Sequence, residues 1–261
     1  MMKKYLSLLI LSSFYLLANA STTFSVDGIF YLYGSGNTAT VTNDMYGSSK
    51  YKGDVVIPEK ITHTYYTEFG DPVTETLTVV GISDVAFADC TELTSVALPQ
   101  TITSIGSSAF SDCSNLTTIN LPAAISNIGD YAFANCSKLQ SLQLSDNVKA
   151  IYKSTFLNCT SLSSINIGNS IETIAENAFF GCKALASITI PDATRLIYAN
   201  AFYNCSSIED ITLGIKVSFI GDYCFYNCVK LKSINLTDNI TQIKGSAFEN
   251  CTSLSEIYLG K

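Results

Sequence analysis

Cysteine is the residue type whose spacing most strongly suggests chemistry in this chain. Eight of the nine cysteines recur at a constant interval of 23 residues, namely Cys90, Cys113, Cys136, Cys159, Cys182, Cys205, Cys228 and Cys251. A zinc site needs ligands that converge on one ion, usually from closely spaced pairs, and this interval offers no such convergence. Cys224 lies close to Cys228, but it stands where Ala109 and Ala132 stand in other repeats. A metal site is therefore the least favoured interpretation.

Two other interpretations of the cysteine column remain. Disulfides between neighbouring repeats would be stable if the protein is exported to an oxidising compartment. Free cysteine, however, is among the most buried residue types and packs as a small hydrophobe. Side chains in register all point the same way, so most of them would not meet a partner with disulfide geometry. The sequence therefore favours buried thiols over a disulfide ladder.

The single histidine restricts catalytic chemistry further. Any Ser-His-acid or Cys-His arrangement would have to use His63, the only histidine in 261 residues. His63 lies between two threonines with no Gly-x-Ser-x-Gly turn nearby, so we expect an exposed strand residue. Neighbouring carboxylates such as Glu209 and Asp210 are expected on a solvated surface. This inventory predicts a protein that is not an enzyme, with no cofactor and no metal.

The cysteines belong to a 23-residue repeat that also fixes other columns, and such repeats indicate solenoids or similar arrays. Phenylalanine fills one column without a gap, at Phe87, Phe110, Phe133, Phe156, Phe179, Phe202, Phe225 and Phe248. Each cysteine is followed by the pattern Leu-x-x-Ile-x-Leu, as in Leu116, Ile119 and Leu121. Its last three residues alternate inward, outward and inward, which predicts a short strand. A second apolar segment, such as Ile125 and Ile128, follows after a turn.

Each repeat is therefore expected to form one coil, with a strand on one side and a shorter extended segment on the other. One coil cannot bury its own apolar face, whereas stacked coils share a continuous core. The predicted fold is mostly β: a right-handed leucine-rich-repeat solenoid of eight 23-residue coils over residues 79–261. Residues 21–78 do not follow the repeat. Their β-prone runs at 29–33, 38–42, 54–58, 62–67 and 74–80 predict a small N-terminal β cap.

The first 20 residues have the pattern of a secretory signal peptide. Lys3 and Lys4 precede an apolar run that ends at Ala18-Asn19-Ala20. The run is shorter than the roughly 20 residues of a spanning helix, so we predict no membrane span in the mature chain. The sequence thus predicts an exported protein, whether secreted, periplasmic or on the cell surface. Losing the two lysines would make the net charge of −7 two units more negative, which disfavours nucleic acid and membrane-surface partners.

Outward-facing side chains of the predicted strands form a candidate partner-binding face. Its candidate residues are Ser141, Gln143, Ser164, Asn166, Asp210, Glu256 and Tyr258. Most of them are short and polar, whereas binding hot spots are usually Trp, Tyr or Arg, so an inert solvated face is an equal alternative. The last repeat ends on its own strand at Leu259-Gly260-Lys261. An uncapped coil exposes apolar edges, so this C-terminal edge is a candidate for self-association.

The complete repeat reads Leu-x-x-Ile-x-Leu-Pro-x-x-Ile-x-x-Ile-Gly-x-x-Ala-Phe-x-x-Cys, for example from Leu116 to Cys136. Over residues 79–261 it resembles the BspA-type leucine-rich repeat, also called the Treponema pallidum type. The resemblance implies secreted or surface proteins of host-associated microbes that adhere to matrix proteins, other bacteria or epithelial cells, and it implies no catalytic residues. We therefore expect a non-enzymatic binding module for a protein or glycan partner, such as extracellular matrix or another cell surface. The alternative is a structural or self-assembling repeat protein that uses the uncapped C-terminal coil.

Overall fold

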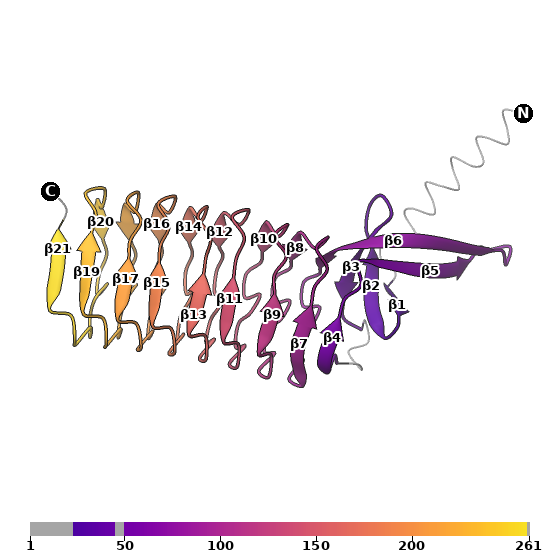
Figure 1. The fold of residues 1–261 in the computed structure, drawn as a ribbon, viewed down its shortest axis with the longest axis horizontal. Coiled ribbons are helices and arrows are strands. Elements are labelled where there is room, and N and C mark those ends of the chain that lie inside the picture. Colours follow the sequence, from indigo (N-terminus) through magenta and orange to yellow (C-terminus); the bar gives the residue numbers. More distant parts are fainter. Residues whose placement is uncertain (1–22, 45–49, 260–261) are drawn as a thin grey trace, which may run out of the picture.

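The computed structural model describes residues 23–44 and 50–259, so the predicted signal peptide lies outside it. All helical or strand structure in these two ranges is β-strand. Figure 1 shows a rod of stacked coils with a group of longer strands at its N-terminal end. A helix of the length and apolarity needed to cross a bilayer does not occur in the described ranges.

Two ladders of short strands run along opposite sides of the rod. The first ladder contains β4 (Gly53–Val56), β7 (Leu93–Ala97), β9 (Thr118–Asn120), β11 (Ser141–Gln143), β13 (Ser164–Asn166), β15 (Ser187–Thr189), β17 (Asp210–Thr212), β19 (Ser233–Leu236) and β21 (Glu256–Leu259). The second contains β8 (Ser104–Ile105), β10 (Asn127–Ile128), β12 (Ala150–Ile151), β14 (Thr173–Ile174), β16 (Leu196–Ile197), β18 (Phe219–Ile220) and β20 (Gln242–Ile243).

Neighbouring coils are offset by one 23-residue repeat. Strands β11 and β13 pair in parallel with Ser141 opposite Ser164, and β12 and β14 pair with Ile151 opposite Ile174. The strand predicted from Leu-x-x-Ile-x-Leu is therefore the first ladder, and the second apolar segment is the other. The predicted solenoid of eight coils is confirmed.

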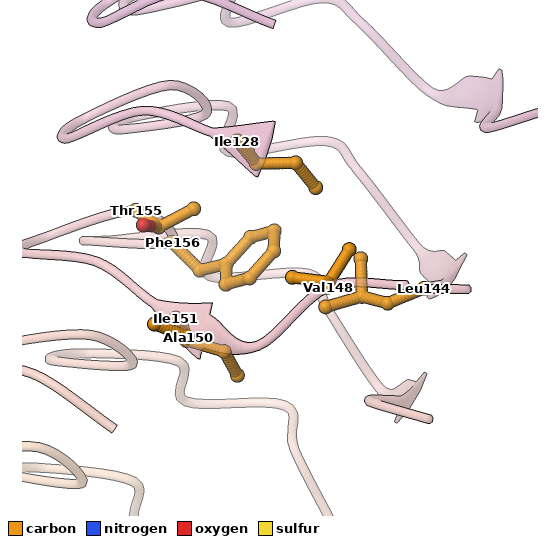
Figure 2. A pocket seen from close by; sticks show the side chains of 7 residues that line it. All are labelled: Ile128, Leu144, Val148, Ala150, Ile151, Thr155 and Phe156. Atoms are coloured by element: carbon orange, nitrogen blue, oxygen red, sulfur yellow. The ribbon is translucent and has the colours of Figure 1, made fainter. Parts of the chain in front are cut away.

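The phenylalanine column forms a continuous stack inside the rod. Neighbouring ring centroids lie 4.9–5.7 Å apart, and their planes are within 14° of parallel. Figure 2 shows the ring of Phe156 among Ile128, Val148 and Ile151, and the space between the side chains drawn there has no room for a water molecule. The interior at this coil is therefore close-packed core and not a ligand cavity.

The residue before each repeating cysteine adopts a left-handed backbone conformation, which explains why asparagine recurs there. Asn135 and Asn158 have φ angles of 60° and 55°, and Gly181 takes the same place with a φ of 72°. Asparagine and glycine tolerate this region better than other residues. The Asn158 side chain also donates from Nδ2 to Oδ1 of Asn135, at 3.1 Å, so the turns of successive coils are linked.

The N-terminal strands continue both ladders. The predicted hairpin at residues 29–33 and 38–42 is formed by β2 (Ile29–Tyr33) and β3 (Thr38–Thr42), and β1 (Thr23–Val26) adds a strand that the sequence did not predict. Strands β5 (Lys60–Tyr66) and β6 (Pro72–Ile82) form the second hairpin. The end of β6 pairs with β8, and β4 pairs with β7. The predicted division at residues 78–79 therefore falls inside β6, and it stays a prediction.

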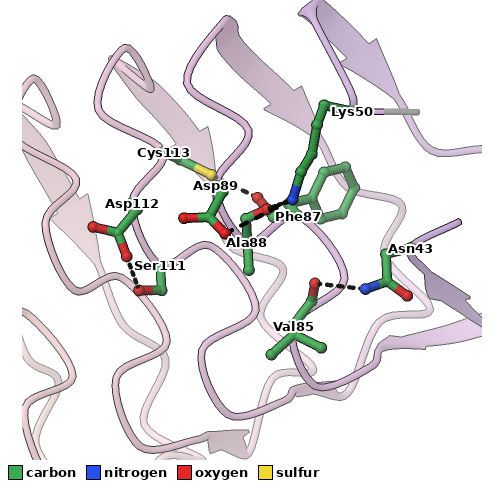
Figure 3. A network of polar contacts seen from close by, with 9 residues as sticks. All are labelled: Asn43, Lys50, Val85, Phe87, Ala88, Asp89, Ser111, Asp112 and Cys113. Atoms are coloured by element: carbon green, nitrogen blue, oxygen red, sulfur yellow. Dashed lines mark hydrogen bonds and ion pairs between the residues drawn. The ribbon is translucent and has the colours of Figure 1, made fainter. Parts of the chain in front are cut away.

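Polar contacts join the N-terminal region to the first coils (Figure 3). The ammonium group of Lys50 donates to the carbonyl oxygen of Ala88 at 2.8 Å and lies 3.8 Å from the carboxylate of Asp89. The side-chain amide of Asn43 donates to the carbonyl oxygen of Val85 at 3.5 Å. These contacts join Asn43 and Lys50 of the N-terminal region to one coil.

His63 is not the exposed strand residue that the sequence predicted. It lies half-buried on β5, where the ring of Phe24 stacks on it with centroids 4.1 Å apart. Its Nδ1 is hydrogen-bonded to the hydroxyl of Tyr33 at 2.6 Å. Burial lowers its pKa, against a smaller raising effect of the Glu75 carboxylate. The prediction was wrong because Phe24 belongs to β1, the strand that the sequence pattern did not reveal.

Candidate partner-binding surface

The outward side chains of the first ladder form an exposed, mostly polar sheet face. Strand geometry produces this face, because successive side chains of a strand point to opposite sides. In β11, Leu142 is buried while Ser141 and Gln143 on either side of it are exposed. All seven residues predicted for partner binding are exposed on this face. Their part in binding is not tested by exposure alone.

The face is hollowed over β9, β11 and β13. The hollow holds about 570 Å³ and is lined by Ile119, Asn120, Leu121, Ser141, Leu142, Gln143, Ser164, Ile165 and Asn166. Ser141 lies opposite Ser164, and Gln143 lies opposite Asn166, in the parallel register of β11 and β13. Four of the seven predicted residues therefore share one site.

The exposed side chains of the hollow are neutral hydrogen-bonding groups, whereas Ile119 and Leu142 of its lining are buried in the core. Amide and hydroxyl side chains can each donate and accept hydrogen bonds, and none of the lining residues is ionisable. The Oδ1 of Asn166 accepts a hydrogen bond from the backbone N–H of Gly168 at 2.9 Å, which holds its amide in place. Such a lining suits an uncharged ligand with hydrogen-bonding groups.

Asn120 is a lining residue that the sequence prediction omitted. It belongs to β9 and is exposed, one coil before Gln143. The signal was present in the sequence, because Asn120, Gln143 and Asn166 are separated by one repeat each. What the repeat did not show is which coils surround the hollow.

The other three predicted residues lie outside the hollow. Asp210 begins β17 and pairs with Ser187 of β15, while Glu256 and Tyr258 lie on β21 opposite Ser233 and Asn235. The Tyr258 hydroxyl donates a hydrogen bond to the Glu256 carboxylate, and this bond raises the pKa of Tyr258. The two side chains are thus hydrogen-bonded to each other at the C-terminal end of the same face.

The cysteines line the core and not the partner-binding face. All nine are buried free thiols, as the favoured interpretation predicted. Burial raises the pKa of Cys159 and of Cys205 to about 12. Since the thiolate is the reactive and metal-binding form, these groups are chemically inert near neutral pH.

Within residues 23–44 and 50–259, no group of three or more His, Cys, Asp or Glu side chains is arranged to hold a metal ion. The C-terminal edge carries exposed Ile257 and Leu259 on β21. Nothing in the described part of the chain contacts them across that edge, so self-association there stays a prediction.

Comparison with known proteins agrees with the repeat. A family model described as the BspA type leucine-rich repeat region, in six copies, matches residues 80–196 and 150–261. A search of curated proteins found no match. The crystal structure of the T. pallidum leucine-rich repeat protein TpLRR is 28% identical with a TM-score of 0.67, covering 80% of this chain and 91% of TpLRR.

Two further solved structures are more distant in sequence. A leucine-rich cell surface protein of Faecalibacterium prausnitzii A2-165 is 21% identical with a TM-score of 0.47, covering 94% of this chain and 96% of that one. The pneumococcal vaccine antigen PcpA is 20% identical with a TM-score of 0.47, covering 93% and 82% respectively. The family model itself spans most of the chain, from residue 80 to residue 261. The protein therefore belongs to the BspA-type leucine-rich repeat family.

Proposed function

We propose that this protein is a non-enzymatic, exported binding module that recognises a protein or glycan partner through its first strand ladder. The observation that carries the proposal is the hollow over β9, β11 and β13, about 570 Å³ in volume and lined by neutral amide and hydroxyl groups. Membership of a repeat family supports a binding module. Adhesion to extracellular matrix or to another cell is the specific role that we propose for it.

The lining indicates the kind of segment that binds. The amides of Gln143 and Asn166 sit in neighbouring coils, which are spaced by roughly 4.8 Å as in any strand ladder. An extended peptide or a neutral saccharide chain laid across these coils would meet one amide per coil. Because the chain carries a net charge of −7, an anionic partner such as nucleic acid is disfavoured.

Charge placed in the hollow tests the proposal. The double variant Gln143→Lys and Asn166→Lys puts two ammonium groups into the lining, on residues that lie opposite each other. The matched control is Thr189→Lys with Thr212→Lys, which lie opposite each other on β15 and β17, are exposed and stand outside the hollow. Both pairs carry the same new charges in the same register.

Binding is measured on arrays of purified extracellular matrix proteins and neutral glycans, followed by titration of each binder. We expect the hollow variant to lose at least about tenfold in affinity for the bound partner. The control should stay within about twofold of the unaltered protein. Equal losses in both variants, or no saturable binder on the arrays for the unaltered chain, would contradict the proposal.

A further inference from the structure

The hairpin of β5 and β6 presents an unpaired strand edge at the N-terminal end of the rod. Figure 1 shows its tip extending beyond the other strands. The backbone N–H of Val79 donates to the carbonyl oxygen of Glu59, and that of Thr67 donates to the carbonyl oxygen of Asp71. These two bonds show which residue pairs of the β5–β6 ladder are hydrogen-bonded pairs. Because hydrogen-bonded pairs alternate in an antiparallel ladder, every second residue of β5 turns its backbone groups away from β6.

The outward backbone positions of β5 are Lys60, Thr62, Thr64 and Tyr66. Within the two described ranges, no strand or turn pairs with the outer N–H or C=O groups of Thr62, Thr64 and Tyr66. The side chains of all three are exposed, and Tyr66 is 70% exposed. The row of backbone donors and acceptors is therefore open to another strand.

Natural sheets usually protect such edges, and in this hairpin the β6 edge is protected at both of its ends. On the opposite edge, β6 begins with Pro72, which has no N–H to offer, and Thr78 donates to the carbonyl oxygen of Asn37. On β5 there is no proline, and its register with β6 is unbroken from Lys60 to Tyr66. The β5 edge thus lacks the protection that Pro72 and Thr78 give to the two ends of the β6 edge, where Thr74 and Thr76 alone are left open within the described ranges.

Packing and hydrogen bonds hold the hairpin in the position that exposes this edge. On its inner face Ile61 is buried, and His63 stacks on Phe24 of β1. At the tip, the hydroxyl of Thr67 accepts hydrogen bonds from the backbone N–H groups of Phe69 and Asp71, at 3.3 and 3.1 Å. Pre-ordering of this kind lowers the entropy cost of binding a further strand.

The sequence of β5 and the turn that follows it is complementary to itself in an antiparallel arrangement centred on Thr64. If Thr64 of one copy lies opposite Thr64 of a second copy, Thr62 lies opposite Tyr66 and Lys60 is brought toward Glu68. Threonine and tyrosine form favourable cross-strand pairs, and the opposite charges of lysine and glutamate attract. Two-fold symmetry makes the Thr62–Tyr66 and Lys60–Glu68 contacts twice and places the Thr64 pair on the axis.

We propose that β5 is a self-association edge, at which two copies of this chain pair antiparallel around Thr64 and join their hairpins into one continuous sheet. The outer N–H and C=O groups of Thr62, Thr64 and Tyr66 then bond to the second copy. This surface is separate from the hollow on the first ladder and from the C-terminal edge. Pairing of one short strand buries less area than the roughly 1,200–2,000 Å² of a stable interface. The dimer is therefore weak and forms only at high protein concentration.

Sedimentation equilibrium of the exported form, residues 21–261, tests the proposal. We expect the mean mass to rise from that of one chain at about 1 μM toward that of two chains at about 1 mM. Thr64→Pro removes one outward N–H and the exposed side-chain hydrogen bond to Thr74, but no backbone hydrogen bond to β6. It should hold the protein at the mass of one chain. The matched control Thr76→Pro, on the unpaired side of β6, should dimerise as the unaltered chain does.

Charge exchange provides a second readout that does not depend on proline. Lys60→Glu and Glu68→Lys each place like charges together across the proposed pair, so each alone should weaken dimerisation by about tenfold. The double variant restores the attraction and should restore the dimer. Circular dichroism checks that each variant folds. A single-chain mass at every concentration, or a dimer that survives both Thr64→Pro and the single charge changes, would overturn the proposal.

Discussion

The thiol of Cys136 donates a hydrogen bond to the carbonyl oxygen of Phe110, 26 residues earlier, at 3.1 Å. The same bond joins a cysteine to a phenylalanine carbonyl of the preceding coil seven times, from Cys113 to Cys251, at 3.0–3.2 Å. Cysteine suits this place because it is small and apolar and yet keeps one weak donor for a buried carbonyl group. The two invariant columns of the repeat are thus joined between neighbouring coils.

Replacing one thiol of this ladder should destabilise the fold. Cys159→Ala leaves the carbonyl oxygen of Phe133 without its thiol donor and opens a small void in a close-packed core. We expect the free energy of unfolding to fall by about 1–3 kcal/mol, as measured by urea denaturation. Ser164→Ala on the exposed face is the control and should change it by less than about 0.5 kcal/mol. Equal values for the two variants would contradict a structural role for the thiol.

Thiol reactivity should distinguish the native protein from the unfolded one. A thiol-reactive dye should label almost no cysteine in the native state and all nine after denaturation without a reductant. Cys251 is the most exposed of them, at 9%, whereas Cys136, Cys159 and Cys182 are fully buried, so Cys251 should react first. Cys251→Ala should remove this early phase. Fewer than nine reactive groups after denaturation would show that disulfides had formed.

Alkaline pH should weaken the fold through these same buried thiols. Burial raises the pKa of Cys159 and Cys205 from 9.0 to about 12. Below pH 9 both states keep the proton, so stability does not depend on pH through these groups. Between pH 9 and 12 only the unfolded chain loses the proton, so the stability falls as pH rises. At pH 10.5 the loss should be about 2 kcal/mol for each such thiol.

The measurement is the urea midpoint at pH 8, 9, 10 and 10.5. A constant midpoint over this series would mean that the thiols are not protected in the folded state. In Cys205→Ala the slope above pH 9 should be smaller, because one titrating group is gone. At pH 8 the thiols do not titrate, so the midpoint of that variant at this pH measures only the stability lost with the packing of the thiol.

Much of the fold could be predicted from the sequence because each coil repeats the same environment. A column such as Phe110, Phe133 and Phe156 has one explanation only, a place in the core that every coil shares. The alternation around Leu142 similarly predicted that Ser141 and Gln143 would be exposed. Periodicity carries this information in several copies, so single substitutions do not hide it.

The N-terminal strands and the hollow could not be predicted from the 23-residue repeat. The N-terminal strands occur once, so β1 and its Phe24 gave no repeated signal, and the burial of His63 was missed. The hollow over β9, β11 and β13 is lined by residues of three neighbouring coils, and the repeat does not show which coils these are. Alternation identifies the exposed face but does not locate a depression on it, and so Asp210, Glu256 and Tyr258 were grouped with residues that they do not contact.

In the phenylalanine stack, the loss of stability on substitution should depend on the position of the ring along the rod. Phe156 has ring neighbours on both sides, with centroids 5.7 Å from Phe133 and 5.3 Å from Phe179. Phe248 stacks on Phe225 at 5.3 Å, is only partly buried, and meets no second ring among the residues that the structure describes. In a stacked solenoid, stability is approximately a sum over neighbouring coils. Phe156→Leu disturbs two such interfaces and Phe248→Leu disturbs one.

We therefore expect Phe156→Leu to lower the free energy of unfolding by about 1–3 kcal/mol. Phe248→Leu should cost about half as much. Both are measured by urea denaturation with circular dichroism at pH 7, where the thiols do not titrate. Phe69→Leu is the control, because this side chain is 79% exposed at the hairpin tip and its loss should leave stability unchanged. If Phe248→Leu cost as much as Phe156→Leu, the coils would not contribute as separate neighbouring interfaces, and the additive description of this rod would fail.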